Sequence, residues 1–402
     1  MDASELKDQY DYVIVGAGVA GAAAVKGIRD VDSNGSVAVL GAEPDEPVYR
    51  PDLSKKLWLE DDAKVDDSKL GVPDGVEFVT STPVEAIDTD AHQVSAGGKQ
   101  VGYGKLLIAT GGSPRTIDLP DDDRVIYYRT LADYRRLRDL TPEGSTATVI
   151  GGGFIGSELA SALAQNGVGV TWIMPEDKVQ QAIFPPDLAD QLTTKYADNN
   201  VTLRTGQLVT GGRIDGPSVT VQTDKGDEVT SDVVVVGAGI TAADRLADAA
   251  GIEVDEGIVV DQTLQTTAPD VYAAGDVVRY QDPLLGRRRV EHVDNAEHMG
   301  ERAGRNMAGE SDPYDYTPFF WSDLFDAGYE AIGDLSSKRE MVEDWNEAHD
   351  AGVVYYLGDK GAVVGVLLWN VWDSVDKARE VMAKSKDGSL GRDDLIGAIP
   401  LG

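Results

Sequence analysis

The 402-residue chain carries 70 acidic side chains against 36 basic ones, a formal net charge of -34, and it has no cysteine. This charge repels nucleic acid, and the absence of thiols excludes a structural disulfide, a thiolate metal site and a redox-active dithiol. The 45 glycines and the 42% of hydrophobic residues are typical of a folded α/β enzyme, and the length predicts two or three domains.

The acidic residues are scattered along the chain rather than gathered in a tail, as the runs at 60–62, 66–67 and 121–123 illustrate. We interpret them as a solvated acidic surface, because concentrated salt screens the self-repulsion of such a charge. The composition therefore predicts a cytoplasmic protein of a salt-adapted organism. The polar first residues show no secretory signal, and no apolar run approaches the ~20 residues needed to span a bilayer, so no membrane span is expected.

The beginning of the chain has the pattern strand, turn, helix, strand. An apolar, β-branched run at 11–15 precedes a glycine, an alanine-rich stretch extends to Arg29, and a second apolar run follows at 36–40. The same order returns between 147 and 173. This repeat predicts two domains of the same dinucleotide-binding type.

Later segments predict chain crossings and a third domain. The buried-strand patterns at 105–110 and 233–236 each end in glycine, which suggests crossings between the two repeats. Further on, two strand-like runs at 353–357 and 362–369 flank the turn sequence at 358–361, which is a hairpin pattern.

The predicted fold class is therefore α/β, with two Rossmann-like dinucleotide-binding domains, for FAD and NAD, and a C-terminal α+β domain. The predicted segments are 1–114 and 240–314 for the FAD-binding domain, 115–239 for the NAD(P)H-binding domain and 315–402 for the C-terminal domain.

The sequence GAGVAG at 16–21 follows the first predicted strand and opens the helix, and Glu43 follows the next strand. The first glycine permits a tight turn, the second lets the backbone approach a pyrophosphate, and the third allows close packing of helix and strand. The helix N-terminus stabilises the phosphate charge, and Glu43 would accept ribose hydroxyls. The alternative is a glycine-rich turn that binds nothing.

A second fingerprint, GGGFIG at 151–156, is followed by Glu176. Two such sites imply two dinucleotides, and the economical pair is a fixed flavin with an exchangeable nicotinamide. An acidic residue at the second strand end favours NADH over NADPH, because it repels a 2′-phosphate. Met174 and the nearby Lys178 leave NADPH open as a donor.

Two segments resemble the two-dinucleotide flavoprotein reductases. The sequence TTAPDVYAAGD at 266–276 is similar to their closing flavin motif, which implies that Asp276 holds the ribityl chain of FAD. The sequence RPDLSK at 50–55 resembles the RPPLSK segment of the ferredoxin reductase branch, with Asp52 in place of proline. The resemblance implies that Arg50 meets the FAD pyrophosphate and that Lys55 approaches flavin N5.

Three further stretches, at 285–292, 320–324 and 328–333, resemble apoptosis-inducing factor and its prokaryotic relatives. The resemblance extends over essentially the whole chain and is weakest at 338–346, where the sequence predicts no element. It implies a set of roles at the reaction site. Phe154 and His292 flank the nicotinamide, Glu158 pairs with Lys55, and Trp321 lies near the flavin.

These implied roles agree with simple electrostatics. A lysine close to N5 stabilises negative charge on reduced flavin and raises its potential. We expect Glu158 on the first turn of its helix, pointing into the cleft between the dinucleotides, where pairing would satisfy a buried lysine. The plainer alternatives are an ordinary surface ion pair for Lys55 and Glu158, and core packing for Trp321.

The predicted catalytic residues are Lys55, Glu158, His292 and Trp321. The predicted FAD-side residues are Gly16, Gly18, Val19, Ala20, Gly21, Glu43, Arg50, Lys55, Thr110, Gly111, Arg115, Gly275, Asp276, Glu291 and His292. The predicted NAD-side residues are Gly151, Gly153, Phe154, Ile155, Gly156, Glu158, Glu176, Gly239, Trp321 and Glu330. No metal site is predicted, because His92, His298 and His349 lack partners at ligand spacing.

The predicted function is transfer of a hydride from NADH to FAD, followed by electron transfer to an acceptor that is not a thiol. Open acceptors are a ferredoxin- or rubredoxin-type carrier, a quinone or dye, and dioxygen. The alternative hypothesis is a redox-sensing flavoprotein, similar to apoptosis-inducing factor, in which a long-lived charge-transfer complex with NADH changes dimerisation. A homodimer is left open.

Overall fold

The computed structural model describes residues 5–401. The chain forms two compact units. Unit 1 contains the residues up to Arg50 together with Val65–Ser113 and Thr241–Pro318, and unit 2 contains Pro51–Lys64, Pro114–Ile240 and the residues from Phe319 onward. The four-segment division predicted from the sequence is finer than these units and stays a prediction.

Unit 1 is built on a sheet that begins with β1 (Gln9–Val15) and β2 (Val37–Leu40), which pair in parallel. The order is β3-β2-β1-β6-β5-β4, with β18 also pairing β6. The remaining strands are β3 (Val76–Val79), β4 (Val84–Asp88), β5 (Gln93–Ala96), β6 (Lys99–Ile108) and β18 (Val271–Ala273). The predicted strand, turn, helix, strand order is confirmed, and the turn between β1 and the helix α1 (Val19–Val31) lies at the carboxyl end of a buried parallel strand.

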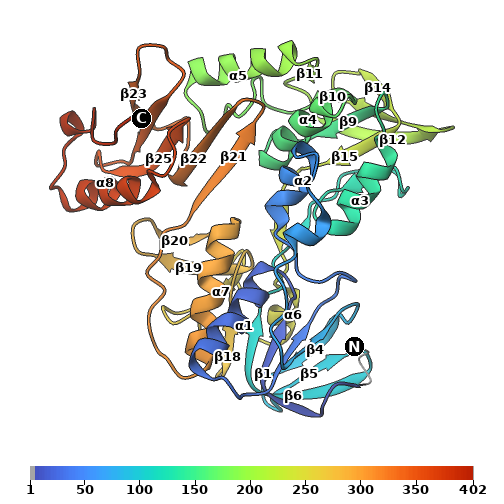
Figure 1. Ribbon diagram of the computed structural model, residues 1–402, viewed down its shortest axis with the longest axis vertical. Coiled ribbons are helices and arrows are strands. Elements are labelled where there is room, and N and C mark those ends of the chain that lie inside the picture. The colour runs from blue at the N-terminus through green and yellow to red at the C-terminus, as the bar shows by residue number, and fades with distance from the viewer. Residues whose placement is uncertain (1–4, 402) are drawn as a thin grey trace. The chain divides into compact units, whose positions relative to one another are not determined.

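Two helices of unit 1, α1 and α7 (Val293–Met307), lie side by side (Figure 1). Glycines let their backbones touch: a Cβ at Gly300 would lie under 3.0 Å from the carbonyl oxygen of Ala20, and one at Gly304 equally close to that of Ala24. Gly27 of α1 makes the reciprocal approach to α7. The helix that carries the first fingerprint is therefore locked to α7 by backbone contact.

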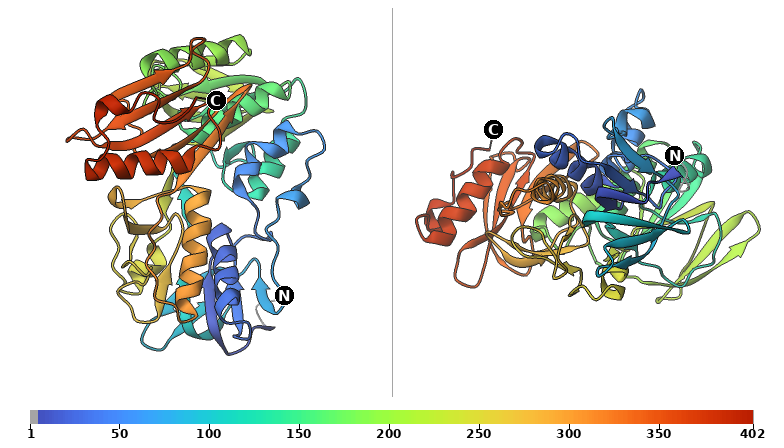
Figure 2. Two further views of the ribbon diagram at one scale, coloured as in Figure 1. Left: turned by 60° about the vertical axis from the view of Figure 1, so that its left-hand side comes forward. Right: turned by 90° about the horizontal axis from the view of Figure 1, so that it is seen from below.

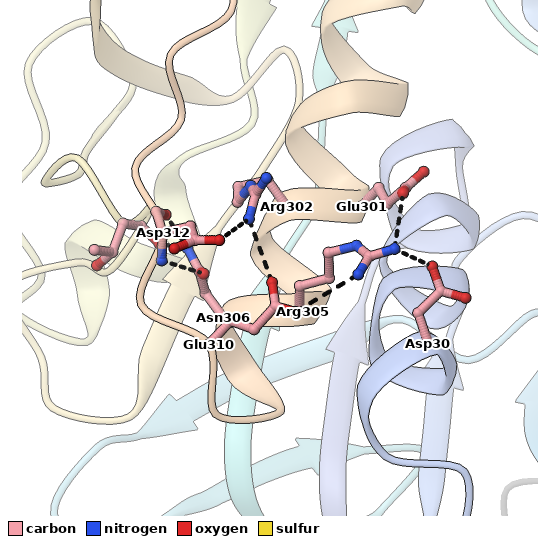
Figure 3. Close-up of polar contacts among 8 residues, drawn as sticks. Asp30, Glu301, Arg302, Arg305, Asn306, Glu310 and Asp312 are labelled. Atoms are coloured by element: carbon pink, nitrogen blue, oxygen red, sulfur yellow. Dashed lines mark hydrogen bonds and ion pairs between the residues drawn. The ribbon is translucent and has the colours of Figure 1, made fainter.

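Charged side chains reinforce this helix pair on its exposed side (Figure 3). Arg305 of α7 pairs with Asp30 of α1, and Lys26 of α1 pairs with Glu301 at 2.8 Å. Arg302 contacts carboxylates of the segment after α7, Glu310 at 3.3 Å and Asp312 at 3.0 Å. These partly exposed pairs add small increments to a contact that the glycines determine.

The rest of unit 1 consists of small elements. They are the helix α6 (Arg245–Ala249) and a three-stranded sheet of order β17-β19-β20, with β17 (Ile258–Val259), β19 (Val278–Asp282) and β20 (Gly286–Arg289). At the predicted crossings, β7 (Gly112–Pro114) pairs with β16 (Ile240–Ala242). Short helical segments cover Arg50–Leu53, at the boundary of the two units, and Val65–Ser68 of unit 1, while α2 (Lys56–Leu59) and the short segment Arg392–Asp394 belong to unit 2.

Unit 2 contains a second parallel sheet, of order β11-β10-β9-β15-β8. Its strands are β8 (Val125–Tyr127), β9 (Thr146–Ile150), β10 (Gly169–Ile173), β11 (Thr202–Arg204) and β15 (Val233–Val236). Its helices are α3 (Leu131–Leu140), α4 (Phe154–Gln165) and α5 (Pro186–Asp198), and a separate antiparallel sheet holds β12 (Val209–Asp215), β13 (Ser218–Thr223) and β14 (Glu228–Ser231). The predicted repeat of the dinucleotide-binding pattern is confirmed.

The C-terminal part of unit 2 is an antiparallel sheet of order β21-β22-β25-β24-β23, with α8 (Val375–Asp387) lying along it (Figure 2). Its strands are β21 (Phe319–Leu324), β22 (Ala327–Gly333), β23 (Glu340–Trp345), β24 (Gly352–Leu357) and β25 (Val363–Trp369). The predicted hairpin of β24 and β25 and the α+β class are confirmed. The strand β23 falls in the stretch for which the sequence predicted no element.

This sheet is fastened to the nucleotide-binding part of unit 2 through Phe184, which precedes α5 and is 1% exposed. Its ring stands edge-on to Tyr329 and Trp369, with centroid distances of 5.2 and 5.7 Å. The Tyr356 hydroxyl also donates to the carbonyl oxygen of Ile183 at 2.6 Å. Aromatic packing of this kind explains why the two parts form one unit. Within residues 5–401, no helix combines the length and apolarity that a bilayer crossing requires.

Candidate functional site

The first fingerprint has the geometry of a phosphate-binding turn. Gly16 has φ +114°, and a Cβ there would lie under 3.0 Å from the carbonyl oxygen of Ala109. Gly21 is equally close to the carbonyl of Gly16. Gly18 differs, because a Cβ there would meet no atom of the described chain within 4 Å. Space is therefore open beside the N-cap residue of α1, where the first backbone N–H groups of a helix can bind an anion.

One ion pair of unit 1 follows β2, whose next residue, Gly41, lies against Ala17 of this turn. Glu43, just beyond β2, pairs with Arg50, the Nη2 to Oε1 distance being 2.6 Å. Both side chains keep partial exposure, 39% for Glu43 and 26% for Arg50. The resemblance had assigned the first to ribose and the second to pyrophosphate, and the structure brings the two residues together.

The closing flavin motif lies against the same helix. Gly275 follows β18 with φ +84°, and a Cβ on it would stand 3.0 Å from the Cβ of Ala20. Val19 and Ala20 are buried in the first turn of α1. The neighbouring carbonyl of Asp276 accepts a hydrogen bond from Arg289 at 3.0 Å. The two sequence motifs for FAD therefore meet at one place in unit 1.

The arginine strand β20 leads into the N-terminus of α7. Arg289 pairs with the exposed Glu291 at 2.6 Å, so this arginine contacts a neighbouring carboxylate. His292 is the N-cap residue of α7. Burial, and after it the positive charge of Arg288, lower the pKa of His292 to about 3. The imidazole is neutral near pH 7.

The predicted residues around the chain crossings fall on both sides of the unit boundary. In unit 1, the Thr110 hydroxyl donates to the carbonyl oxygen of Ala243 at 2.8 Å, and Gly111 has φ +66°. Arg115, predicted on the FAD side, lies in unit 2, where its backbone N–H donates to the carbonyl oxygen of Gly239 at 2.9 Å.

The second fingerprint repeats the geometry of the first. Gly151 has φ +113°, and a Cβ on it would lie under 3.0 Å from the Gly237 carbonyl oxygen. Gly156 is tightly packed against Gly151, whereas a Cβ at Gly153, the N-cap residue of α4, would find no described atom within 4 Å. The residues of unit 2 thus fit a second pyrophosphate.

Glu176 lies against this loop. Its carboxylate occupies the place where a Cβ on Gly152 would be, and its Oε2 atom is buried without a hydrogen-bond partner among residues 5–401. Buried carboxylate oxygens are almost always satisfied in folded proteins. An oxygen left unsatisfied beside a dinucleotide fingerprint fits a ribose hydroxyl as its partner.

Phe154 and Ile155 begin α4 directly after the fingerprint. The Phe154 ring packs on Phe320 of β21 with a centroid distance of 5.0 Å, and Ile155 is 37% exposed. The implied flanking of a nicotinamide by Phe154 and His292 involves one residue of each unit and stays a prediction.

Unit 2 contains a buried ion pair between Lys55 and Glu158, with 2.7 Å between Nζ and Oε1. The side chains are 13% and 4% exposed, so the alternative of an ordinary surface pair is wrong. Two hydroxyls complete the shell: Ser54 donates to Oε2 at 2.5 Å and Ser322 donates to Oε1 at 2.7 Å. These hydrogen bonds help to offset the desolvation free energy of the two buried charges.

The position of Glu158 corrects one expectation. It is the fifth residue of α4, at the start of the second helical turn rather than on the first. Glu158 has this position because α4 begins at Phe154. Its side chain is buried and accepts a hydrogen bond from Ser322 of β21. Ser54 and Ser322 were missed, since serine has no spacing signal that separates a buried donor from a surface residue.

Trp321 lies next to this pair. Lys55 Nζ is 5.8 Å from the centroid of the Trp321 ring, a cation–π distance, and Trp321 is only partly buried, unlike a core side chain. Glu330 stands opposite Trp321 in the β21–β22 register. Burial raises the pKa of Glu330, and its Oε2 lacks a partner within the described chain. Burial likewise raises the pKa of Asp323, against the opposing effect of Lys55.

The backbone around Lys55 is held by hydrogen bonds from α2, α3 and the segment before α3. Trp58 Nε1 and the Tyr128 hydroxyl both donate to the carbonyl oxygen of Leu53, the first at 2.7 Å. The Tyr134 hydroxyl donates to the carbonyl oxygen of Leu57 at 3.0 Å. Lys55 is therefore rigidly placed within unit 2, although the sequence had placed its segment in the FAD-binding domain.

Comparisons with known proteins agree with this site. The pyridine nucleotide-disulphide oxidoreductase family matches residues 10–300, and the C-terminal, mitochondrion-associated region of apoptosis-inducing factor matches 303–349 and 335–384. Apoptosis-inducing factor 1 of Dictyostelium discoideum is 34% identical, covering 94% of this chain and 79% of the relative. The ferredoxin–NAD(+) reductase component of the anthranilate 1,2-dioxygenase system of Burkholderia cepacia is 35% identical, covering 92% and 94%. The reductase in a covalent putidaredoxin reductase–putidaredoxin complex superimposes with a TM-score of 0.86 at 28% identity, covering 97% of each chain.

Proposed function

Because the chain belongs to the pyridine nucleotide-disulphide oxidoreductase family, it is an FAD-dependent NAD(P)H oxidoreductase, and we propose that NADH is its donor and a small ferredoxin-type protein its acceptor. The observation that carries the proposal is the buried pair of Lys55 and Glu158 in a chain with two open fingerprint turns. When bound, FAD accepts a hydride from the nicotinamide and releases the electrons to the acceptor.

Different residues of the chain are proposed to bind the pyrophosphates, the flavin and the nicotinamide. Gly18 and Gly153 leave room for two pyrophosphates, and the α1 and α4 N-termini stabilise their charge. We propose that Lys55 presents its ammonium group to the flavin, as the resemblance implies, and that Glu158 fixes it there. The neutral His292 and the ring of Phe154 are each proposed to contact the nicotinamide, as the resemblance implies.

The donor preference rests on Glu176. Its buried, unsatisfied oxygen can accept ribose hydroxyls, whereas the 2′-phosphate of NADPH would meet a carboxylate. NADH is therefore the proposed donor, with NADPH a weaker substrate.

The acceptor follows from two observations. The chain has no cysteine, so its residues supply no dithiol relay of the kind that disulfide reduction uses. The relatives named above include a ferredoxin–NAD(+) reductase component and a reductase crystallised with putidaredoxin. Rubredoxin-type carriers, quinones and dioxygen are the competing acceptors.

The charge supports a further proposal about working conditions. A net charge of -34 destabilises a compact fold at low ionic strength and repels an acidic carrier, and salt relieves both effects. We propose a protein that works in concentrated salt. A cytoplasmic location remains a prediction from the sequence.

A second candidate function is favoured by the match of 303–384 to the C-terminal region of apoptosis-inducing factor. In this alternative, NADH binding produces a slowly reoxidised flavoprotein that signals by dimerisation. Sedimentation of the protein with and without NADH distinguishes it, because only the sensor changes mass.

Steady-state turnover tests the proposed function. The purified flavoprotein in concentrated KCl is supplied with NADH and, separately, with a [2Fe–2S] carrier, a quinone or dioxygen. Fastest turnover with the iron–sulfur carrier supports the proposal. Slow turnover with every acceptor, together with an NADH-dependent dimer, would replace it by the sensor.

A further inference from the structure

We propose that Ser322 is a positioning residue that fixes the Glu158 carboxylate and, through it, the ammonium group of Lys55. The inference rests on the proposed placement of Lys55 beside the flavin. It adds a function for the C-terminal sheet, because Ser322 belongs to β21.

The contacts of the carboxylate single out this serine. Oε1 of Glu158 pairs with Lys55 Nζ and accepts a hydrogen bond from the Ser322 hydroxyl, each at 2.7 Å. Oε2 accepts a hydrogen bond from the Ser54 hydroxyl at 2.5 Å. Ser322 is fully buried and Ser54 is 3% exposed, so bulk water cannot replace either hydroxyl. Ser54 precedes Lys55 in the chain, whereas Ser322 is the donor that comes from a separate element.

The alternation of β21 explains how the sheet delivers this hydroxyl. Phe320 and Ser322 lie on one face of the strand, where they contact Phe154 and Glu158 of α4. The Phe320 ring also packs on the ring of Phe154 at the start of α4. Ser322 is thereby held at hydrogen-bond distance from a carboxylate 164 residues away in sequence.

Removal of this hydroxyl has a predictable electrostatic consequence. Without the Ser322 hydroxyl, the Glu158 carboxylate loses one of the hydrogen bonds that hold it against Lys55. A displaced carboxylate leaves the positive charge of Lys55 less balanced, and positive charge beside a flavin raises its midpoint potential. A side chain that matters only for packing would leave the potential unchanged.

The test is the flavin midpoint potential of the holoenzyme, measured anaerobically in concentrated KCl between pH 5.5 and 8.5. For Ser322→Ala we expect a positive shift of the flavin midpoint potential across this pH range. Ser322→Thr, which keeps the hydroxyl, should restore the wild-type curve, and the exposed Ser389→Ala is the matched control. Curves that coincide for Ser322→Ala and wild type would overturn the proposal.

Two further variants separate this inference from the proposed function. Glu158→Gln should raise the potential at every pH. If Glu158→Gln shifts the midpoint potential and Ser322→Ala does not, the inference about Ser322 is wrong but the proposed function stands. If neither variant shifts the midpoint potential, the proposed placement of Lys55 and Glu158 beside the flavin is wrong as well. If Ser322→Ala does not retain flavin, Ser322→Cys replaces it in the comparison, because a thiol is a weaker donor of similar size. A midpoint potential of Ser322→Cys that equals the wild-type value at every pH would contradict the proposal.

Discussion

Gly300 of α7 lies directly on the backbone of Ala20 in α1, so close that a single added methyl group would come under 3.0 Å from the Ala20 carbonyl oxygen. Ala20 also belongs to the first fingerprint and touches Gly275 of the closing flavin motif. Two contacts at Ala20 therefore connect three sequence-distant segments that carry or border the predicted FAD site.

Gly300→Ala is expected to destabilise the protein by about 3 kcal/mol or more, because a rigid carbonyl cannot move aside as a side chain would. Thermal melts and the flavin content of the purified protein measure the effect. A melting temperature within the error of wild type would show that the helices can separate at little cost.

Gly18→Ala should behave in the opposite way. An added methyl meets no atom of the described chain within 4 Å, so the apoprotein should keep its melting temperature to within a few degrees. FAD should bind about tenfold more weakly or worse, since the backbone can no longer approach the pyrophosphate.

Gly153→Ala is expected to weaken NADH binding for the same reason, which a raised KM for NADH would show. Unchanged cofactor binding in both variants would contradict the assigned turns.

Glu176→Ala is predicted to narrow the preference for NADH over NADPH by about tenfold, through loss of a ribose acceptor and of the repulsion toward a 2′-phosphate. Rates of flavin reduction by the two donors give the ratio. The exposed neighbour Asp177→Ala is the control, and an equal change there would assign the effect to net charge alone.

His292 should remain neutral from pH 5 to 8, because its pKa is lowered to about 3. The unfolded chain takes up this proton near pH 6.5, so the stability contribution is complete above that pH and is lost as the pH falls toward 3. NMR of the imidazole ring checks the titration, and His292→Gln should flatten the pH dependence of unfolding in that window. A ring that titrates near 6.5 would refute this account.

Salt should raise the melting temperature over a wide range. Screening relieves the repulsion among the 70 acidic side chains, while it weakens exposed pairs such as Arg213–Glu228 that contribute little. Melting curves from low to molar KCl test this expectation. A melting temperature that falls with added KCl would show that the ion pairs outweigh the repulsion.

The sequence predicted most of the local architecture, because the fingerprint glycines follow from backbone geometry alone. Gly16 and Gly151 have nearly the same φ, and each packs against the carbonyl after a neighbouring strand, as the motif requires. Glu176 lies against the second fingerprint loop, whereas Glu43 pairs with Arg50, and the role of both residues toward a ribose stays a prediction.

Other features depend on tertiary contacts that leave no sequence pattern. The strand β23 is at the edge of its sheet, so it lacks the continuous apolar run of β24. Lys55 lies in unit 2 because distant side chains such as Tyr128 and Tyr134 bind the carbonyls of its segment. Ser322 could be found only once β21 was placed on α4.

Anaerobic stopped-flow spectroscopy tests the central claim most directly. The oxidised flavoprotein, in concentrated KCl, is mixed first with NADH and then with a [2Fe–2S] carrier. The account predicts rapid bleaching of the flavin by NADH, slower bleaching by NADPH, and rapid return of the yellow colour on mixing with the carrier. A flavin that NADH reduces but that the carrier leaves reduced would contradict the assignment as an electron-transfer reductase.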